Sequence, residues 1–176
     1  MLLQPIARIA QFDLNFSILC LDHRFSIEVA KVCRWISRTG DGPLYVVLAM
    51  ALLWLRPTLG WSFLCAGLLA FAIELPIYWL TKNAVRRRRP AELTRVIPAF
   101  ITPSDRYSLP SGHSAAAMVM ATLIAYFFPA FAVVALLWAM AVGLSRILLG
   151  VHFLSDVIVG MLLGAASANA ALLMVS

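Results

Sequence analysis

Charged side chains are scarce in this sequence, and acidic ones are the scarcest. Only 12% of the 176 residues are charged, with 8 Asp and Glu against 14 Lys and Arg, while 62% are hydrophobic. This apolar share exceeds that of soluble domains, so the composition predicts an integral membrane protein with one domain over residues 1–176. The three cysteines, Cys20, Cys33 and Cys65, have neither paired nor metal-ligand spacing. We therefore expect them to be packing residues and expect no disulfide or metal site from them.

A recognisable cleavable signal is also lacking. Arg8 and Asp13 interrupt any apolar run near the N-terminus, so we expect the chain to enter the membrane through its own spanning helices. No segment has the pattern of a soluble module that reads nucleic acid. The expected environment is therefore the membrane, and no nucleic-acid partner is expected.

The positive charge is concentrated in residues 82–106, which contain seven basic residues and only two acids, Glu92 and Asp105. The basic residues are Lys82, Arg86, Arg87, Arg88, Arg89, Arg95 and Arg106. Such a cluster suits phosphate or anionic headgroups. For Arg86, Arg87 and Arg88 we favour a solvated basic rim over direct contact with a headgroup or pyrophosphate.

Five apolar runs separated by polar or Pro-containing breaks predict an all-α bundle of about five transmembrane helices within residues 43–176. The expected spans are residues 44–55, 61–80, 113–128, 131–149 and 152–175. The first is short unless Arg56 snorkels to the interface. Glu74 in the second span could be the buried partner of a cation or could line a polar seam between helices, and we slightly favour the second interpretation. Small residues from Gly160 to Ala168 favour close helix packing.

Residues 1–42 are amphipathic and contain no apolar run long enough to span. One helical stripe holds Phe25, Val29, Val32 and Ile36, and the opposite side holds Lys31, Arg34 and Arg38. The pattern predicts an amphipathic helix that lies in the headgroup region or covers the bundle. We interpret this region as a lid without chemistry.

Three polar clusters stand at the ends of the predicted spans. They are Lys82 with Arg89-Pro90, then Pro110-Ser111-Gly112-His113, and finally Ser145-Arg146 with His152 and Asp156. In a hairpin arrangement, the end of the second span, the start of the third and the junction of the last two lie on one side of the membrane. Connectivity alone therefore predicts that the three clusters converge.

The residue types in these clusters suit a phosphoryl group. Fixed positive charge neutralises phosphoryl oxygens, and the planar fork of arginine can bind two of them. A serine and a glycine at a helix start supply N–H donors and allow close approach of an anion. The candidate phosphate-binding residues are Lys82, Arg89, Ser111, Gly112 and Arg146.

Two histidines provide what a two-step displacement needs, because one can attack phosphorus while the other protonates the departing oxygen and later activates water. If residues 152 onward are helical, His152 and Asp156 stand one turn apart on the same face. The carboxylate can then take the proton of one ring nitrogen and leave the other free to attack. The alternative is that His152 and Asp156 only satisfy each other's hydrogen-bonding groups between helices and have no catalytic role.

The spaced set Lys82-x6-Arg89-Pro90, Pro110-Ser111-Gly112-His113 and Ser145-Arg146-x5-His152-x3-Asp156 resembles the signature of the type 2 phosphatidic acid phosphatase (PAP2) family, over about residues 40–175. The resemblance implies a membrane phosphatase that works through a phosphohistidine without a metal or other cofactor. His152 would be the nucleophile, oriented by Asp156, and His113 the general acid and then base. The five phosphate-binding candidates would hold the phosphoryl group, with Ser145 in a supporting role.

The resemblance also implies a bacterial plasma-membrane enzyme with its site facing the periplasm or the cell exterior. Counting Lys and Arg alone would instead place the loop at 81–110 in the cytoplasm. The short chain resembles undecaprenyl pyrophosphate phosphatases of cell-wall lipid recycling. Phosphatidylglycerol phosphate and phosphatidic acid are alternative substrates, and a non-catalytic lipid-phosphate transporter is the alternative of a different class. The oligomeric state stays open.

Overall fold

The computed structural model describes residues 3–22, 26–93, 99–103 and 105–175, so the basic residue Arg95 lies outside the described residues. The described part of the chain contains helices and no β-strand, which confirms the predicted all-α class. In chain order the elements are α1 (Leu3–Leu21), α2 (Ser26–Thr39), α3 (Gly42–Leu55), α4 (Pro57–Val85), α5 (Pro90–Leu93), α6 (Gly112–Phe127), η1 (Pro129–Phe131), α7 (Ala132–Leu148) and α8 (Leu154–Val175).

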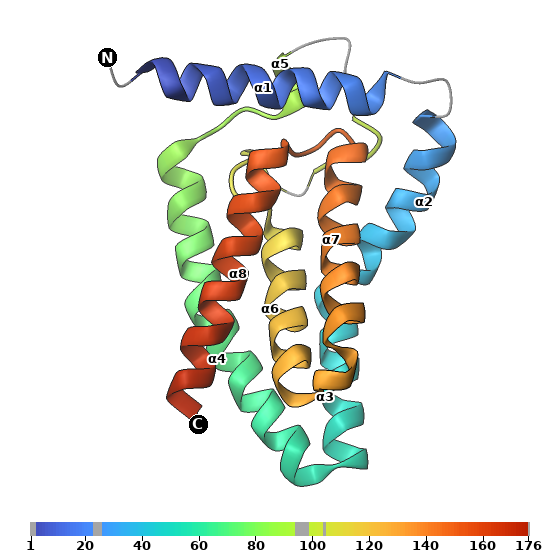
Figure 1. Cartoon of the computed structure of the whole chain (residues 1–176), viewed down its shortest axis with the longest axis vertical. Coiled ribbons are helices and arrows are strands. Elements are labelled where there is room, and N and C mark those ends of the chain that lie inside the picture. The colour runs from blue at the N-terminus through green and yellow to red at the C-terminus, as the bar shows by residue number, and fades with distance from the viewer. Residues whose placement is uncertain (1–2, 23–25, 94–98, 104, 176) are drawn as a thin grey trace.

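The helices α3, α4, α6, α7 and α8 form an elongated bundle with α6 in its middle, packed against α4, α7 and α8 (Figure 1). Helices α6 and α8 approach each other closely at two glycines. A Cβ atom on Gly160 would lie 2.5 Å from the carbonyl oxygen of Ser111, and one on Gly164 would overlap the carbonyl group of Ala115. The close packing predicted for the small residues of the last span is confirmed at these two glycines.

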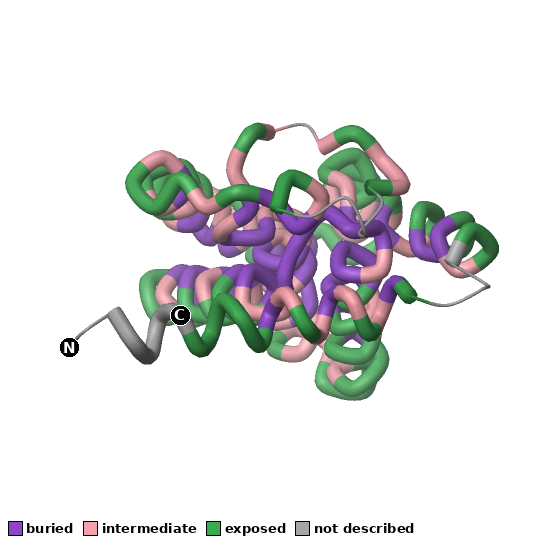
Figure 2. The backbone as a smooth tube through the Cα atoms, turned by 90° about the horizontal axis from the view of Figure 1, so that it is seen from above, coloured by how far each residue is buried: buried purple, intermediate pink, exposed green. Residues whose placement is uncertain are grey.

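Within the described residues, three segments are long and apolar enough to cross a membrane, namely Pro57–Leu93, Pro129–Leu148 and Leu154–Val175. The helices α3 and α6 are apolar but shorter, at 14 and 16 residues. Seen from above, the buried backbone lies toward the middle of the bundle and the exposed backbone toward its outside (Figure 2). Large apolar side chains such as Trp54 and Leu173 are more than four-fifths exposed. A surface this apolar suits contact with lipid and not with water.

The N-terminal region contains two helices in place of the one that we predicted. The first, α1, crosses the end of the bundle, and α2 lies beside α7 (Figure 1). The predicted apolar stripe on α2 was wrong at Val32, which is 60% exposed, and Phe25 lies outside the described residues. The buried positions are Ala30, Cys33 and Ser37. These small side chains form the face of α2 that lies against the rest of the structure, and Val32 lies outside this face.

Three helix boundaries bring polar segments to the end of the bundle that α1 covers. Helix α4 ends where Arg86 adopts a left-handed conformation (φ 53°), which turns the chain into the segment that precedes α6. Helix α6 begins after Ser111, whose side chain accepts a hydrogen bond from Ser114 N–H and so caps the helix. Between α7 and α8 the chain turns at Gly150 (φ 74°).

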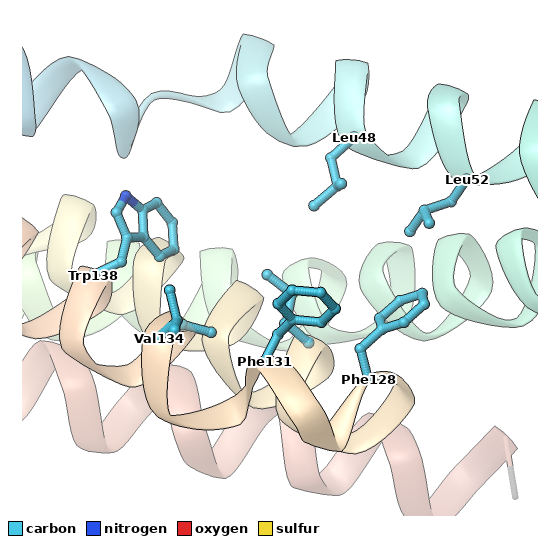
Figure 3. Close-up of a pocket in the computed structure, with 8 residues that line it drawn as sticks. Leu48, Leu52, Phe128, Phe131, Val134 and Trp138 are labelled. Carbon is cyan, nitrogen blue, oxygen red and sulfur yellow. The ribbon is translucent and has the colours of Figure 1, made fainter.

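An apolar pocket of about 410 Å³ lies between α3 and the segment of η1 and α7 (Figure 3). Its lining consists of Leu48, Leu52, Ile124, Phe128, Phe131, Val134, Ala135 and Trp138. None of these side chains carries charge, and Leu52 and Phe128 stand near the helix ends farthest from α1. The pocket therefore suits hydrocarbon and has none of the groups that would bind phosphate.

Candidate active site

The three polar clusters meet at the α1 end of the bundle and are joined by hydrogen bonds. The backbone N–H of Ser111 donates to the carbonyl oxygen of Asp156 at 3.0 Å, which links the start of α6 to the start of α8. Arg89 Nη1 donates to the carbonyl oxygen of Val151 at 2.6 Å, which links the segment after α4 to the α7–α8 turn. These contacts confirm that the clusters converge, as connectivity predicted.

His152 lies in the turn between α7 and α8 and is 3% exposed. Its Nδ1 is 2.7 Å from the carbonyl oxygen of Ser108. Since a carbonyl oxygen only accepts, Nδ1 carries the ring proton and donates it, which leaves the lone pair on Nε2. Burial lowers the pKa of His152 to about 4, against the opposing effect of the nearby Asp156 carboxylate. The ring is therefore neutral at pH 7 and has a free nitrogen.

Asp156 is fully buried in the first turn of α8. Its Oδ2 accepts a hydrogen bond from the Phe153 N–H at 2.8 Å and lies 3.7 Å from His152 Nδ1. The second separation exceeds hydrogen-bond length, so Ser108 and not Asp156 holds the ring proton here. The reason is that α8 begins at Leu154, so His152 is not in the helical turn that the sequence predicted for it. The role of Asp156 in orienting His152 stays a prediction.

Lys82 and Arg89, two of the phosphate-binding candidates, both form ion pairs with Asp105. The hydroxyl group of Tyr78 also donates to this carboxylate. Burial by itself would raise the pKa of Asp105, but the hydrogen bonds from Lys82 and Tyr78 and the charge of Arg89 bring it below its ordinary value. An anion is thus already held by the cations that the sequence assigned to phosphate.

The two buried arginines have fixed side chains and spare donors. Besides Val151, Arg89 binds the carbonyl oxygen of Tyr107 at 3.0 Å, and Arg146 Nη1 donates to Ser37 Oγ at 2.6 Å. The Nε atoms of Arg89 and Arg146 are buried and find no hydrogen-bond partner in the described part of the chain. An unpartnered buried donor is unfavourable unless an acceptor such as an anion arrives.

A cavity of about 330 Å³ lies at this end of the bundle, and its wall combines motif residues with residues of the N-terminal region. It is lined by Arg34, Ser37, Arg38, Asp41, Ile101, Thr102, His113, Arg146 and Leu149. His113 and Arg146 therefore face the same space, together with two arginines of α2. His152 is not part of the lining, and its backbone N–H lies 3.3 Å from the carbonyl oxygen of Arg146.

At the start of α6, the structure assigns different tasks to the neighbouring motif residues. The Ser111 hydroxyl accepts a hydrogen bond from Ser114 Oγ at 2.8 Å and is completely buried. A Cβ atom on Gly112 would lie 3.1 Å from the Tyr78 ring, so the missing side chain makes room for Tyr78. His113 Nε2 is 3.0 Å from Asp41 Oδ1, which comes from the turn before α3. The second histidine thus has a carboxylate partner that the sequence did not suggest.

Residues 58–176 match the family model described as the PAP2 superfamily. The match covers more than half of the chain and includes all three clusters. The chain belongs to the PAP2 superfamily. The resemblance inferred from the spaced motifs is therefore confirmed at the level of the family.

Curated relatives of this PAP2 chain carry the names of lipid phosphatases. Phosphatidylglycerophosphatase B of Bacillus subtilis (strain 168) is 32% identical over 133 residues, which are 69% of this chain and 61% of the relative. The lipid A 1-phosphatase of Rhizobium johnstonii is 30% identical over 121 residues, which are 66% of this chain and 46% of the relative. The alignments thus span about half to three-fifths of the length of these relatives.

Solved structures share the fold over nearly the whole PAP2 chain. Aquifex aeolicus LpxE superposes with a TM-score of 0.79 at 25% identity, covering 92% of this chain and 94% of that one. A transmembrane PAP2-type phosphatidylglycerolphosphate phosphatase from Bacillus subtilis superposes with a TM-score of 0.74 at 24% identity, covering 95% and 86%. The helical membrane bundle is therefore the architecture of this chain as well.

The sequence did not single out the acidic residues that touch the PAP2 motifs. Asp105 was seen only as one of two acids in a basic segment and Asp13 only as an interruption of an apolar run, and Asp41 was given no role. Asp13 and Asp105 are isolated acids in an apolar and a basic surrounding, whereas Asp41 stands between two glycines. An acid in such a sequence context needs a partner once it is buried, but the sequence does not say which residue that partner is.

Proposed function

We propose that this protein is a membrane phosphatase that hydrolyses a lipid phosphomonoester or diphosphate through a phosphohistidine on His152. The observation that carries the proposal is the fixed tautomer of His152, a neutral buried imidazole whose Nδ1 is tied to the Ser108 carbonyl. A ring held in this way keeps the Nε2 lone pair available, which is what attack on an electrophile such as phosphorus needs. A protein that merely binds or transports lipid phosphate needs the cations but has no use for such a ring.

In the first step Nε2 of His152 attacks phosphorus while the bond from phosphorus to the leaving oxygen breaks. His113 donates its proton to that oxygen, which leaves as the lipid alcohol or as the lipid monophosphate. In the second step His113 takes a proton from water, whose oxygen attacks the phosphohistidine. The bond from phosphorus to Nε2 then breaks and inorganic phosphate is released. No metal or other cofactor takes part.

The cations would stabilise the charge that spreads over the three equatorial oxygens during both steps. Lys82, Arg89 and Arg146 supply this charge, and the free Nε donors of the two arginines support the assignment. Because Asp105 now pairs with Lys82 and Arg89, a phosphoryl group has to displace that carboxylate. Ser111 and Gly112 would shape the start of α6, whose N–H groups face the developing anion.

An apolar pocket that suits a lipid tail is lined in part by residues next in sequence to this site. A second pocket, of about 550 Å³, lies between α3 and α4 and is lined almost wholly by apolar side chains. Gly42 and Ala116 belong to its lining, and they follow the paired residues Asp41 and His113 by one and three positions. A substrate with its phosphate beside His113 can therefore leave its tail in hydrocarbon, which supports a lipid over a soluble phosphate ester.

For the lipid itself, undecaprenyl pyrophosphate, converted to undecaprenyl phosphate and inorganic phosphate, is the substrate that we propose first. The 32% identity to a protein named phosphatidylglycerophosphatase B favours phosphatidylglycerol phosphate as the second candidate, with phosphatidic acid as a further alternative. We place the enzyme in the bacterial plasma membrane with its site toward the periplasm or cell exterior. The high charge of the loop serves catalysis in this proposal and so does not report orientation.

The decisive experiment measures phosphate release in detergent from undecaprenyl pyrophosphate, phosphatidylglycerol phosphate and phosphatidic acid. Wild-type protein is expected to turn over at least one of them, and His152→Ala none. Acid quenching of wild type with a ³²P-labelled substrate is expected to trap label on protein, and this label is absent in His152→Ala. Full turnover by His152→Ala would reject the nucleophile, and binding without any turnover by wild type would favour the transporter.

A further inference from the structure

Arg87 does not belong to the solvated basic rim in which the sequence placed it. Its Nη1 donates to Asp156 Oδ1 at 2.7 Å, and its Nη2 donates to Asp13 Oδ2 at 2.7 Å. Only a fifth of its side chain is exposed, whereas its neighbours Arg86 and Arg88 are exposed. One guanidinium therefore bridges the carboxylate beside the candidate nucleophile and a carboxylate of the surface helix α1.

The two carboxylates that Arg87 joins are both almost completely buried. Asp13 is 1% exposed and Asp156 is fully buried. A buried carboxylate is costly unless a charge partner and hydrogen bonds compensate it, and the planar fork of arginine can serve two acceptors at once. Asp156 has no other ion-pair partner among the described residues except His152, whose ring is neutral. Arg87 is therefore the cationic partner of Asp156 among the described residues, and it adds to the hydrogen bond that the carboxylate accepts from the Phe153 N–H.

Further contacts fix the position of Arg87 itself. Ser155 Oγ accepts from Arg87 Nη1 at 2.6 Å, and the Ser155 N–H donates to Asp13 Oδ1 at 3.1 Å. The guanidinium carbon of Arg87 lies 4.3 Å from the centre of the Phe153 ring. Since Ser155 and Phe153 flank the first residue of α8, the network holds the same helix start from which Asp156 projects.

We propose that Arg87 and Asp13 are positioning residues for the phosphatase reaction, acting through Asp156 on His152. Arg87 keeps Asp156 ionised and turned so that Oδ2 stays 3.7 Å from His152 Nδ1, where it stabilises the positive charge that the ring gains on attacking phosphorus. Asp13 holds Arg87 from the opposite side. Helix α1 is thus part of the catalytic apparatus and not a lid without chemistry. This inference rests on the proposed function.

The test uses full-length protein in detergent and whichever lipid of the three-substrate panel wild type hydrolyses fastest. Arg87→Gln is expected to lower kcat on the order of 10- to 100-fold, the range found when a group that orients a reacting residue is lost. KM should stay within about twofold, because nucleophile orientation matters in the attack on phosphorus and not in lipid binding. Arg87→Lys keeps the charge and should restore part of kcat.

A double-mutant cycle separates action through Asp156 from a general loss of structure. In the Asp156→Asn background, Arg87→Gln should lower kcat by less than about twofold, because the carboxylate through which it acts is already neutral. Asp13→Asn keeps Arg87 and should lower kcat less than Arg87→Gln does. It probes the outer half of the network even if Arg87→Gln fails to fold.

Matched controls are the exposed residues Arg88 and Asp22, of which Asp22 directly follows α1. Arg88→Gln and Asp22→Asn should leave kcat unchanged. Wild-type kcat in Arg87→Gln, or an equal loss from this substitution with and without Asp156, would overturn the inference while the proposed function stands. A wild-type protein that releases no phosphate from any of the three lipids would overturn both.

Discussion

His152 donates its Nδ1 proton to the backbone carbonyl of Ser108, 2.7 Å away, while the nearer oxygen of Asp156 lies at 3.7 Å. The tautomer is therefore set by the main chain, and the carboxylate acts on the ring only through space. A backbone acceptor cannot be removed by a side-chain change, so the nucleophilic nitrogen stays the same in variants of Asp156.

The first prediction concerns Asp156→Asn. Where an aspartate alone holds the tautomer of a catalytic histidine, the Asn variant loses about 10⁴-fold in kcat. Here we expect a smaller loss, on the order of 10- to 1000-fold, because Ser108 keeps the proton on Nδ1 and only the charge disappears. Steady-state phosphate release checks this, with the melting temperature as a control for folding. A loss beyond 10⁴-fold in folded protein would mean that Asp156 does set the tautomer.

The second prediction concerns pH and stability. The pKa of His152 is about 4 in the folded protein and about 6.5 in the unfolded chain. Between these values the unfolded state binds more protons, so the stability supplied by the neutral ring is complete above pH 6.5 and is lost as pH falls toward 4. The expected loss is about 1.4 kcal/mol for each pH unit. Wild type should destabilise more steeply than His152→Gln when melting is followed from pH 7 to pH 4, and parallel curves would contradict a buried neutral ring.

The third prediction concerns Asp105→Ala. Asp105 occupies Lys82 and Arg89, so its removal should leave these cations free for the substrate phosphate. The expected gain is about 1 kcal/mol, or about fivefold in KM and in the inhibition constant of inorganic phosphate. Glu28→Gln, which removes an exposed carboxylate paired with Lys31, is the control and should change neither. A higher KM in Asp105→Ala would instead assign Asp105 to organising the cations.

The fourth prediction concerns His113 and its partner Asp41. General acid catalysis contributes about 10²- to 10⁴-fold, and it matters most for a poor leaving group. His113→Ala should therefore lose far more activity on a lipid phosphate than on p-nitrophenyl phosphate, whose leaving group needs no proton. Asp41→Asn should show the same selectivity to a smaller degree. Equal losses on both substrates would exclude His113 as the acid.

The fifth prediction concerns metal ions. The described residues contain no group of three or more His, Cys, Asp or Glu side chains that could hold one. The proposed mechanism predicts that EDTA leaves phosphate release unchanged and that vanadate, which resembles a phosphoryl group in transfer, inhibits it. Activity that EDTA abolishes and magnesium restores would contradict the mechanism.

Much of the fold follows from local patterns. Apolar runs predicted the bundle helices, and hairpin connectivity predicted that the three clusters meet. The predictions that were wrong concern features that depend on packing between helices. The split of residues 1–42 into α1 and α2 and the outward position of Val32 were missed, because periodicity shows which residues are apolar but not which face a neighbouring helix presents.

The sequence by itself determined the membrane class, the family and the positions of the motif residues, since hydropathy and fixed spacing are local properties of the chain. Only the tertiary structure decided which groups meet: Arg87 with Asp13 and Asp156, 74 and 69 positions away, and His152 with Ser108. In a medium of low polarity a buried charge or donor is costly without a partner. Which partner it finds depends on how the helices pack, and that choice is made in three dimensions.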